Sequence, residues 1–177
     1  MAQIEDGTGA GFRAKVDKKN RLTAKAVVLP EIHDESDGGN AYSWVSGTFD
    51  YAAADTILLV KNTGEDKLDI EGVWLSGDTD TRVEIHLVTA DVTVAGTTIV
   101  GVNLNTGSAN TASAEAARNE TGNTQGSIIW SGEIHATQNP LFVPLYGSVI
   151  LAKNKSIGVD YVTNGAACDV TILGFFD

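Results

Sequence analysis

From residue 41 onward, apolar and polar positions alternate with the period of β-strands. Short runs rich in Val, Ile, Thr and aromatic residues recur, and Gly, Asn, Asp or Ser bounds each of them. The run 57–60 is apolar throughout and predicts a central strand covered on both faces. Strict alternation predicts that Val83, Ile85 and Leu87 face inward. Strands are expected near residues 42–51, 56–61, 67–75, 82–89, 97–104, 127–135, 141–151, 156–162 and 168–175.

Glycine and proline mark the irregular positions of these strands. Alternation is lost after Gly72, which predicts a bulge or a kink there. Pro140 and Pro144 cannot donate to a strand ladder, so the residues between them belong to an edge strand or to a corner between sheets. Nine short strands and 19 glycines predict an all-β fold, a jelly-roll-type β-sandwich over residues 41–177.

Two segments lack the strand pattern. Residues 30–40 are expected to form an acidic linker, and residues 105–126 a long polar loop in which 113–118 makes one helical turn with Ser113 as its N-cap. Long polar loops in compact domains are often interaction surfaces. We therefore expect subunit or lattice contacts from Asn105, Ser108, Asn110, Glu115 and Arg118.

Charge separates the first 29 residues from the rest. Residues 1–29 hold six basic and three acidic residues, a net charge of +3, whereas residues 30–177 hold six basic and 20 acidic residues, a net charge of −14. This split predicts an extended basic N-terminal arm that lies on another surface. The acidic body argues against nucleic-acid binding. The residues expected to dock the arm are Arg13, Lys15, Lys18, Lys19 and Arg21.

Composition excludes several other classes. The single cysteine, Cys168, rules out an internal disulfide framework and lies in an apolar run, where a small buried thiol is expected. The first residues lack the apolar stretch of a signal peptide, and no run approaches 18 apolar residues, so no membrane partner is expected.

The N-terminal segment resembles the opening of a family of small tailed-phage virion proteins. The resemblance rests on the motifs Asp6-Gly7-Thr8-Gly9-Ala10-Gly11, Ala14-Lys15-Val16-Asp17, Asn20-Arg21-Leu22, Ala26-Val27 and Gly39-Asn40-Ala41-Tyr42. Farther on, Val102-Asn103-Leu104-Asn105-Thr106-Gly107-Ser108 is similar to an Asn-rich strand end at the corresponding place. The likeness covers the first 42 residues well and the rest mainly by pattern.

This resemblance implies a non-enzymatic capsid decoration (cement) protein with a jelly-roll domain. It implies a homotrimer that binds the major capsid protein at the virion surface and is assembled in the bacterial host cytoplasm. It brings no catalytic residues and no cofactor. A tail, neck or head-fibre component and a glycan-binding module of the virion remain alternatives.

Two Glu-x-His pairs carry the remaining candidate chemistry. Within each pair, Glu84 with His86 and Glu133 with His135, both side chains share one face of a strand. Adjacent strands would cluster ligands suited to zinc, although solvent-facing pairs without metal are the simpler expectation. A Gly-x-Ser-x-Gly nucleophile motif is absent from the sequence.

Exposed aromatic residues would support the glycan alternative. By alternation Trp74 shares a face with Leu68 and Ile70, and Trp130 shares one with Ile128, so both tryptophans are expected in the core. The position of Trp44 stays open.

Overall fold

The computed structural model describes residues 15–16, 22–23, 30–52, 55–88, 90–121 and 125–177. The chain divides into two units, residues 1–30 and 31–177. The first unit contains strands β1 (Lys15–Val16) and β2 (Leu22–Thr23), which pair antiparallel. Of Arg13, Lys18, Lys19 and Arg21, none lies within the described residues, so their predicted docking role stays a prediction.

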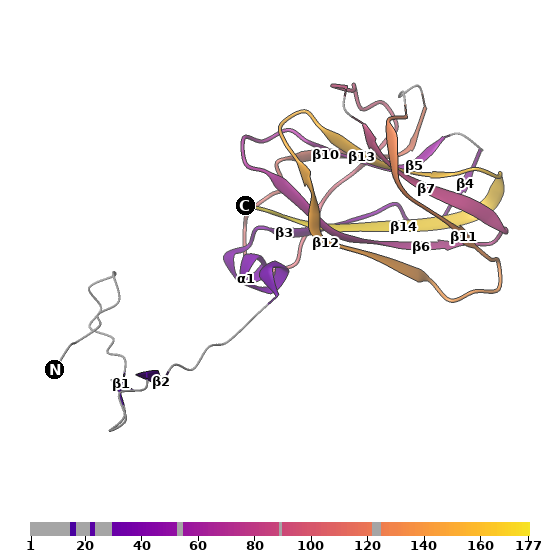
Figure 1. Cartoon of the computed structure of the whole chain (residues 1–177). Helices are drawn as coiled ribbons and strands as arrows, with labels where there is room; N and C mark the ends of the chain where they lie inside the picture. The colour runs from indigo at the N-terminus through magenta and orange to yellow at the C-terminus, as the bar shows by residue number, and fades with distance from the viewer. Residues whose placement is uncertain (1–14, 17–21, 24–29, 53–54, 89, 122–124) are drawn as a thin grey trace. The chain divides into compact units, whose positions relative to one another are not determined.

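The second unit is an all-β sandwich, which confirms the predicted fold class (Figure 1). The first sheet has the order β11-β7-β13-β5-β10-β8, and all pairs in it are antiparallel. Its strands are β5 (Thr56–Asn62), β7 (Thr81–Val88), β8 (Thr97–Ile99), β10 (Ala114–Glu120), β11 (Ser127–Ile134) and β13 (Ser156–Tyr161).

The second sheet has the order β12-β6-β14-β3-β9, and β4 pairs with β14 beside this path. Its pairs are antiparallel as well. Its strands are β3 (Ala41–Val45), β4 (Phe49–Tyr51), β6 (Leu68–Gly77), β9 (Val102–Asn103), β12 (Leu141–Leu151) and β14 (Gly165–Phe176).

The hydrophobic core lies between the two sheets. Strand β5 is buried in every residue, as the apolar run 57–60 predicts for a central strand. Val83 and Ile85 of β7 are fully buried and Leu87 packs against them, so the predicted alternation of β7 is confirmed. From the other sheet Trp44 contributes the largest fully buried side chain, which resolves its open position in favour of the core.

An extra residue in β6 produces the bulge that Gly72 predicts. Gly72 pairs with Leu173 of β14, but the next pair joins Ile70 to Gly174, so Glu71 is left without a partner on β14. The bulge reverses the alternation, because Ile70 and Val73 now face the same side. Trp74 is therefore 43% exposed on the outer face, and the expectation that it lies in the core is wrong.

Strand β12, which follows Pro140 and contains Pro144, is an edge strand of the second sheet, one of the two places predicted for this segment. Its pairing with β6 jumps from Pro144–Gly72 to Val149–Ile70. Between these pairs Tyr146 and Gly147 have φ values of 51° and 67°. A residue other than glycine in this region is unusual, and it marks a second irregular position beside the β6 bulge.

The predicted acidic linker is instead a helix, α1 (Glu31–Gly38), that packs against β3 and β14. Pro30 precedes it, and Glu31 and Asp34 place negative charge in the first turn, where the helix dipole favours it. Gly39, with φ 79°, ends the helix: its N–H donates to Ser36 and the next N–H donates to Glu35. This is the Schellman pattern of helix termination.

The predicted loop 105–126 contains a strand, so its description as one long loop is wrong. Residues 114–120 form β10 between β5 and β8, and the predicted helical turn with Ser113 as its cap does not form. The ladder with β5, from Ala114–Asn62 to Glu120–Thr56, outweighs the helical preference of this Ala-rich segment.

Substitution of Gly72 by alanine should destabilise the sandwich. A β-carbon at Gly72 would lie 2.5 Å from the Phe142 ring and 2.9 Å from the Val143 carbonyl oxygen. We expect Gly72→Ala to lower the free energy of unfolding by about 1–3 kcal/mol in urea titrations. Gly38→Ala is the control, because its β-carbon meets no atom closer than 3.5 Å, and it should not destabilise the fold. Equal stability of both variants would contradict this account of the bulge.

Candidate functional site

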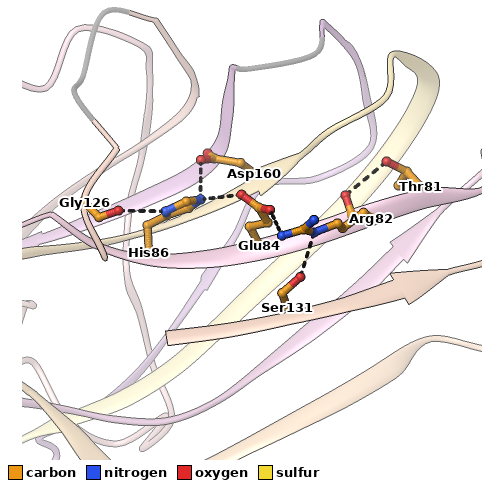
Figure 2. Close-up of polar contacts among 7 residues, drawn as sticks. All are labelled: Thr81, Arg82, Glu84, His86, Gly126, Ser131 and Asp160. Atoms are coloured by element: carbon orange, nitrogen blue, oxygen red, sulfur yellow. Dashed lines mark hydrogen bonds and ion pairs between the residues drawn. The ribbon is translucent and has the colours of Figure 1, made fainter. Parts of the chain in front are cut away.

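Ionisable side chains gather on the outer face of the first sheet (Figure 2). On β7, Val83 and Ile85 face the core, so Glu84 and His86 point to the opposite side. Strand β13 lies next to β7 and places Asp160 directly opposite Glu84. His86 and Asp160 are each only 3% exposed, so these two side chains are buried although they lie on an outer face.

His86 is held from both ring nitrogens. Its Nδ1 lies 3.2 Å from the Gly126 carbonyl oxygen, which can only accept, so this nitrogen carries a proton. Its Nε2 lies 3.1 Å from Asp160 Oδ2 and 3.4 Å from Glu84 Oε2. The imidazole thus joins β7, β13 and the segment that precedes β11.

Arg82 extends the cluster along β7. Its guanidinium lies 2.5 Å from Glu84 Oε1, and its Nε donates to the Ser131 hydroxyl of β11 over 2.9 Å. Arg82, Glu84, His86 and Asp160 therefore form one continuous chain of contacts between ionisable groups on two strands, β7 and β13.

Burial raises the pKa of Asp160 to about 6, above its ordinary value of 3.8. In this net value of the pKa, the charges of Glu84 and Asp55 add to the effect of burial, whereas a hydrogen bond from Thr56 and the charge of His86 oppose it. The buried Asp160 carboxyl and the His86 ring thus form a close pair between β13 and β7.

A histidine beside a carboxylate is a component of many acid–base catalytic sites, but here the pair is enclosed. Both contacts of Nε2 are to carboxylates, and neither is to a serine, threonine or cysteine that would act as a nucleophile. The near-complete burial of His86 and Asp160 also separates them from a substrate in solution. The arrangement is suited to fastening strands together.

The first Glu-x-His pair lies on β7 and Glu133 of the second lies on the adjacent strand β11, but the register keeps the two pairs apart. His86 is paired with Ile128 near one end of the ladder, whereas Glu133 is paired with Arg82 near the other. His135 lies beyond the end of β11, with its Nδ1 3.6 Å from Asp80. Among the residues that the structure describes, no group of three His, Cys, Asp or Glu side chains is arranged to hold a metal ion.

The predicted contact residues of the 105–110 segment bind the end of helix α1 in the same chain. The Asn105 amide donates to the Asp37 carbonyl over 3.0 Å, and the Asn110 amide donates to the Gly39 carbonyl over 3.3 Å. Asn103 also donates to Gly39, over 2.8 Å. Ser108 lies so close to Gly39 that a β-carbon there would be 2.3 Å from its hydroxyl oxygen.

The other two predicted contact residues lie on β10. Arg118 donates to the Ser46 carbonyl over 2.9 Å and lies over the Phe49 ring at 5.2 Å, so it is engaged within the chain. Glu115 is exposed and paired in register with Lys61. Glu115 and Asn110 are thus the two exposed residues of the five, and the predicted subunit or lattice contact stays a prediction.

Sequence reasoning missed Asp160 and Arg82 as members of the cluster. Asp160 stands in the run Ser-Ile-Gly-Val-Asp-Tyr of β13, where a carboxylate is unusual because the whole strand is buried. A carboxylate in a largely apolar strand was the sequence signal that could have indicated a buried partner for Asp160. No comparable signal marks Arg82 in the sequence, because a basic residue at the start of an alternating strand is common.

No family model, no curated protein and no solved structure matches this chain. Among the described residues, no helix has both the length and the apolar character needed to cross a membrane.

Asp160 should make stability depend on pH. Because its folded pKa is raised, its favourable contribution is complete below pH 3.8 and is lost as the pH rises through about 6. We expect Asp160→Asn to remove this dependence, so that the stability difference from wild type changes by on the order of 2 kcal/mol over this window. Val159→Ala, a core change on the same strand, is the control and should destabilise equally across it. Urea titrations at a series of pH values measure both, and a pH-independent difference for Asp160→Asn would refute the assignment.

Cys168 should be unreactive in the folded protein. It is 2% exposed, and burial, followed by the charges of Asp169 and Asp78, raises its pKa to about 12. At mildly alkaline pH the group is therefore a thiol and not the reactive thiolate. We expect a thiol reagent such as Ellman's reagent to modify it only in the guanidinium-unfolded chain. Rapid modification of the native protein would contradict the described burial.

Proposed function

We propose that the protein is a non-enzymatic structural component of a tailed-phage virion, a capsid decoration protein that binds the major capsid protein through residues 1–29. The observation that carries the proposal is a coincidence of two boundaries. Residues 1–29 carry a net charge of +3 and residues 30–177 carry a net charge of −14. The chain divides into its two units after residue 30, almost at the same point. A basic segment set apart from an acidic body suits attachment to an acidic surface.

The sandwich supports this role because it has a hydrophobic core of its own. Among the residues that the structure describes, every member of the core cluster lies between Tyr42 and Phe176. We therefore assign the attachment to residues 1–29 and the folded body to the sandwich. The resemblance of residues 6–42 to the opening of phage virion proteins points to the same class.

The closed polar cluster also supports a role without catalysis. His86 and Asp160, which hold the most promising acid–base geometry of the described residues, contact other charged groups and are shielded from solvent. Attachment through repeated weak contacts needs no such site, since many copies on one particle add their binding energies.

We also propose that the sandwich is a jelly roll. Its support is the pairing of the eight principal strands, β3, β5, β6, β7, β11, β12, β13 and β14. The first of them pairs with the eighth, the second with the seventh, the third with the sixth and the fourth with the fifth. This nesting is what results when one long antiparallel hairpin rolls into two sheets.

Assembly follows from this proposal. We expect homotrimers on the capsid surface, formed in the bacterial cytoplasm, where the single thiol of Cys168 stays reduced. Three basic segments on one trimer would bind a repeating lattice far more tightly than one segment alone.

Removal of residues 1–29 should abolish attachment and leave the fold intact. In co-sedimentation with capsids that lack this protein, we expect the full chain to pellet and the 30–177 chain to remain in the supernatant with unchanged circular dichroism and thermal unfolding.

A second variant tests the role of charge. Replacement of Arg13, Lys15, Lys18, Lys19 and Arg21 by glutamine should weaken attachment of the full-length chain and reduce its dependence on salt. Full occupancy of capsids by the truncated chain would overturn the proposal. Sedimentation with isolated tails and not with capsids would overturn the capsid location.

A further inference from the structure

The bulge at Glu71 turns a tryptophan outward on the face of the second sheet. Strand β6 places Leu68 and Ile70 in the core, and the extra residue shifts the alternation so that Val73 and Leu75 are inside and Trp74 is outside. Bulges that aim a side chain away from the core are often functional features. The indole is 43% exposed, so a ligand in solution can reach it.

The indole is held in a rigid setting. Phe142 of β12 lies opposite Trp74 in register, and the two ring centroids are 4.8 Å apart at an interplanar angle of 35°. On the other side Thr171 of β14 is paired with Trp74. Because both neighbouring strands hold it, the ring needs little ordering when a ligand binds.

A hollow of 340 Å³ lies beside the Trp74 ring and combines apolar and polar groups. This volume is at the small end of the range for ligand sites. The carboxylate of Asp169 and the hydroxyl groups of Ser76 and Thr171 offer hydrogen bonds, and one of the Asp169 oxygens is 3.4 Å from the Ser46 hydroxyl. The lining residues are Trp74, Leu75, Ser76, Pro140, Asp169 and Thr171.

These groups match the chemistry of a sugar ring. A pyranose has one face of C–H groups, which packs on an indole, and a rim of hydroxyl groups, which bind carboxylates and hydroxyls. The net charge of −14 over residues 30–177, with Asp169 in the hollow itself, disfavours an anionic ligand. We propose that this hollow is a binding site for a neutral hexose or N-acetylhexosamine unit of a glycan, with Trp74 as the stacking platform and Asp169 as the hydrogen-bond acceptor.

The proposal goes beyond capsid attachment. It gives the sandwich a second contact, to a glycan, through residues of β6 and β14 and through Pro140. A decoration protein with this site would fasten the particle to a polysaccharide, and failure of one contact would leave the other intact.

Titration of the full-length protein with maltotetraose, cellotetraose and chitotetraose tests the site. We expect saturable binding of at least one of them, seen as a change in tryptophan fluorescence and as heat in calorimetry. Trp74→Ala should weaken that binding at least about tenfold, and Trp74→Phe, which keeps a smaller ring, should weaken it less. Asp169→Asn should also weaken it, because a charged acceptor is lost.

The matched control is Ile128→Ala, since Ile128 has a similar exposure of 47% but lies on the other sheet. It should leave binding unchanged, and circular dichroism should show that every variant is folded. The proposal fails if none of the three oligosaccharides binds more tightly than about 5 mM. It also fails if Trp74→Ala binds as well as wild type. Salt-sensitive binding of pentalysine at Trp74 without binding of any oligosaccharide would overturn it in favour of a cationic peptide.

Discussion

The period-two alternation of β6, broken once at Glu71, is the constraint on which the sandwich depends. Strand β6 lies between β12 and β14, so its phase decides which side chains of the second sheet meet the core. Before the bulge Leu68 and Ile70 face inward, and after it Val73 and Leu75 do. Without the extra residue, Trp74 would enter the core in place of Val73 and Leu75. One backbone irregularity thus determines both the packing inside and the aromatic surface outside.

The regular strands could be predicted because their own residues carry the pattern. The apolar run 57–60 indicated a central strand, and the alternation of 82–87 indicated a half-covered one. The loss of alternation at Gly72 located the bulge, but the consequence for Trp74 was missed because the alternation of Leu68 and Ile70 was carried across the irregular position. A bulge has to be counted as one extra residue before any side chain beyond it is assigned to a face.

Helix α1 and strand β10 could not be predicted because their residues lack the expected pattern. Helix α1 has no buried residue, so it shows no apolar face for periodicity to detect, and its end is set by Gly39 together with the distant Asn103 and Asn110. Strand β10 is rich in alanine and reads as helical. It forms a strand because it pairs with β5 and β8, and such long-range pairing cannot be predicted from local residue propensities. The same limit applies to the charged cluster, since Asp160 reaches His86 only through the pairing of β13 with β7.

The two edges of the second sheet are both poor templates for growth. Strand β9 has two residues, and β12 carries Pro144, which has no N–H to offer, followed by the irregular stretch around Tyr146 and Gly147. A free edge normally invites another strand to add to it. At these two edges an added strand would meet no long unbroken row of backbone donors and acceptors. Strand addition between copies of this chain is therefore directed away from the second sheet and toward the first, whose edge strand β11 has eight residues.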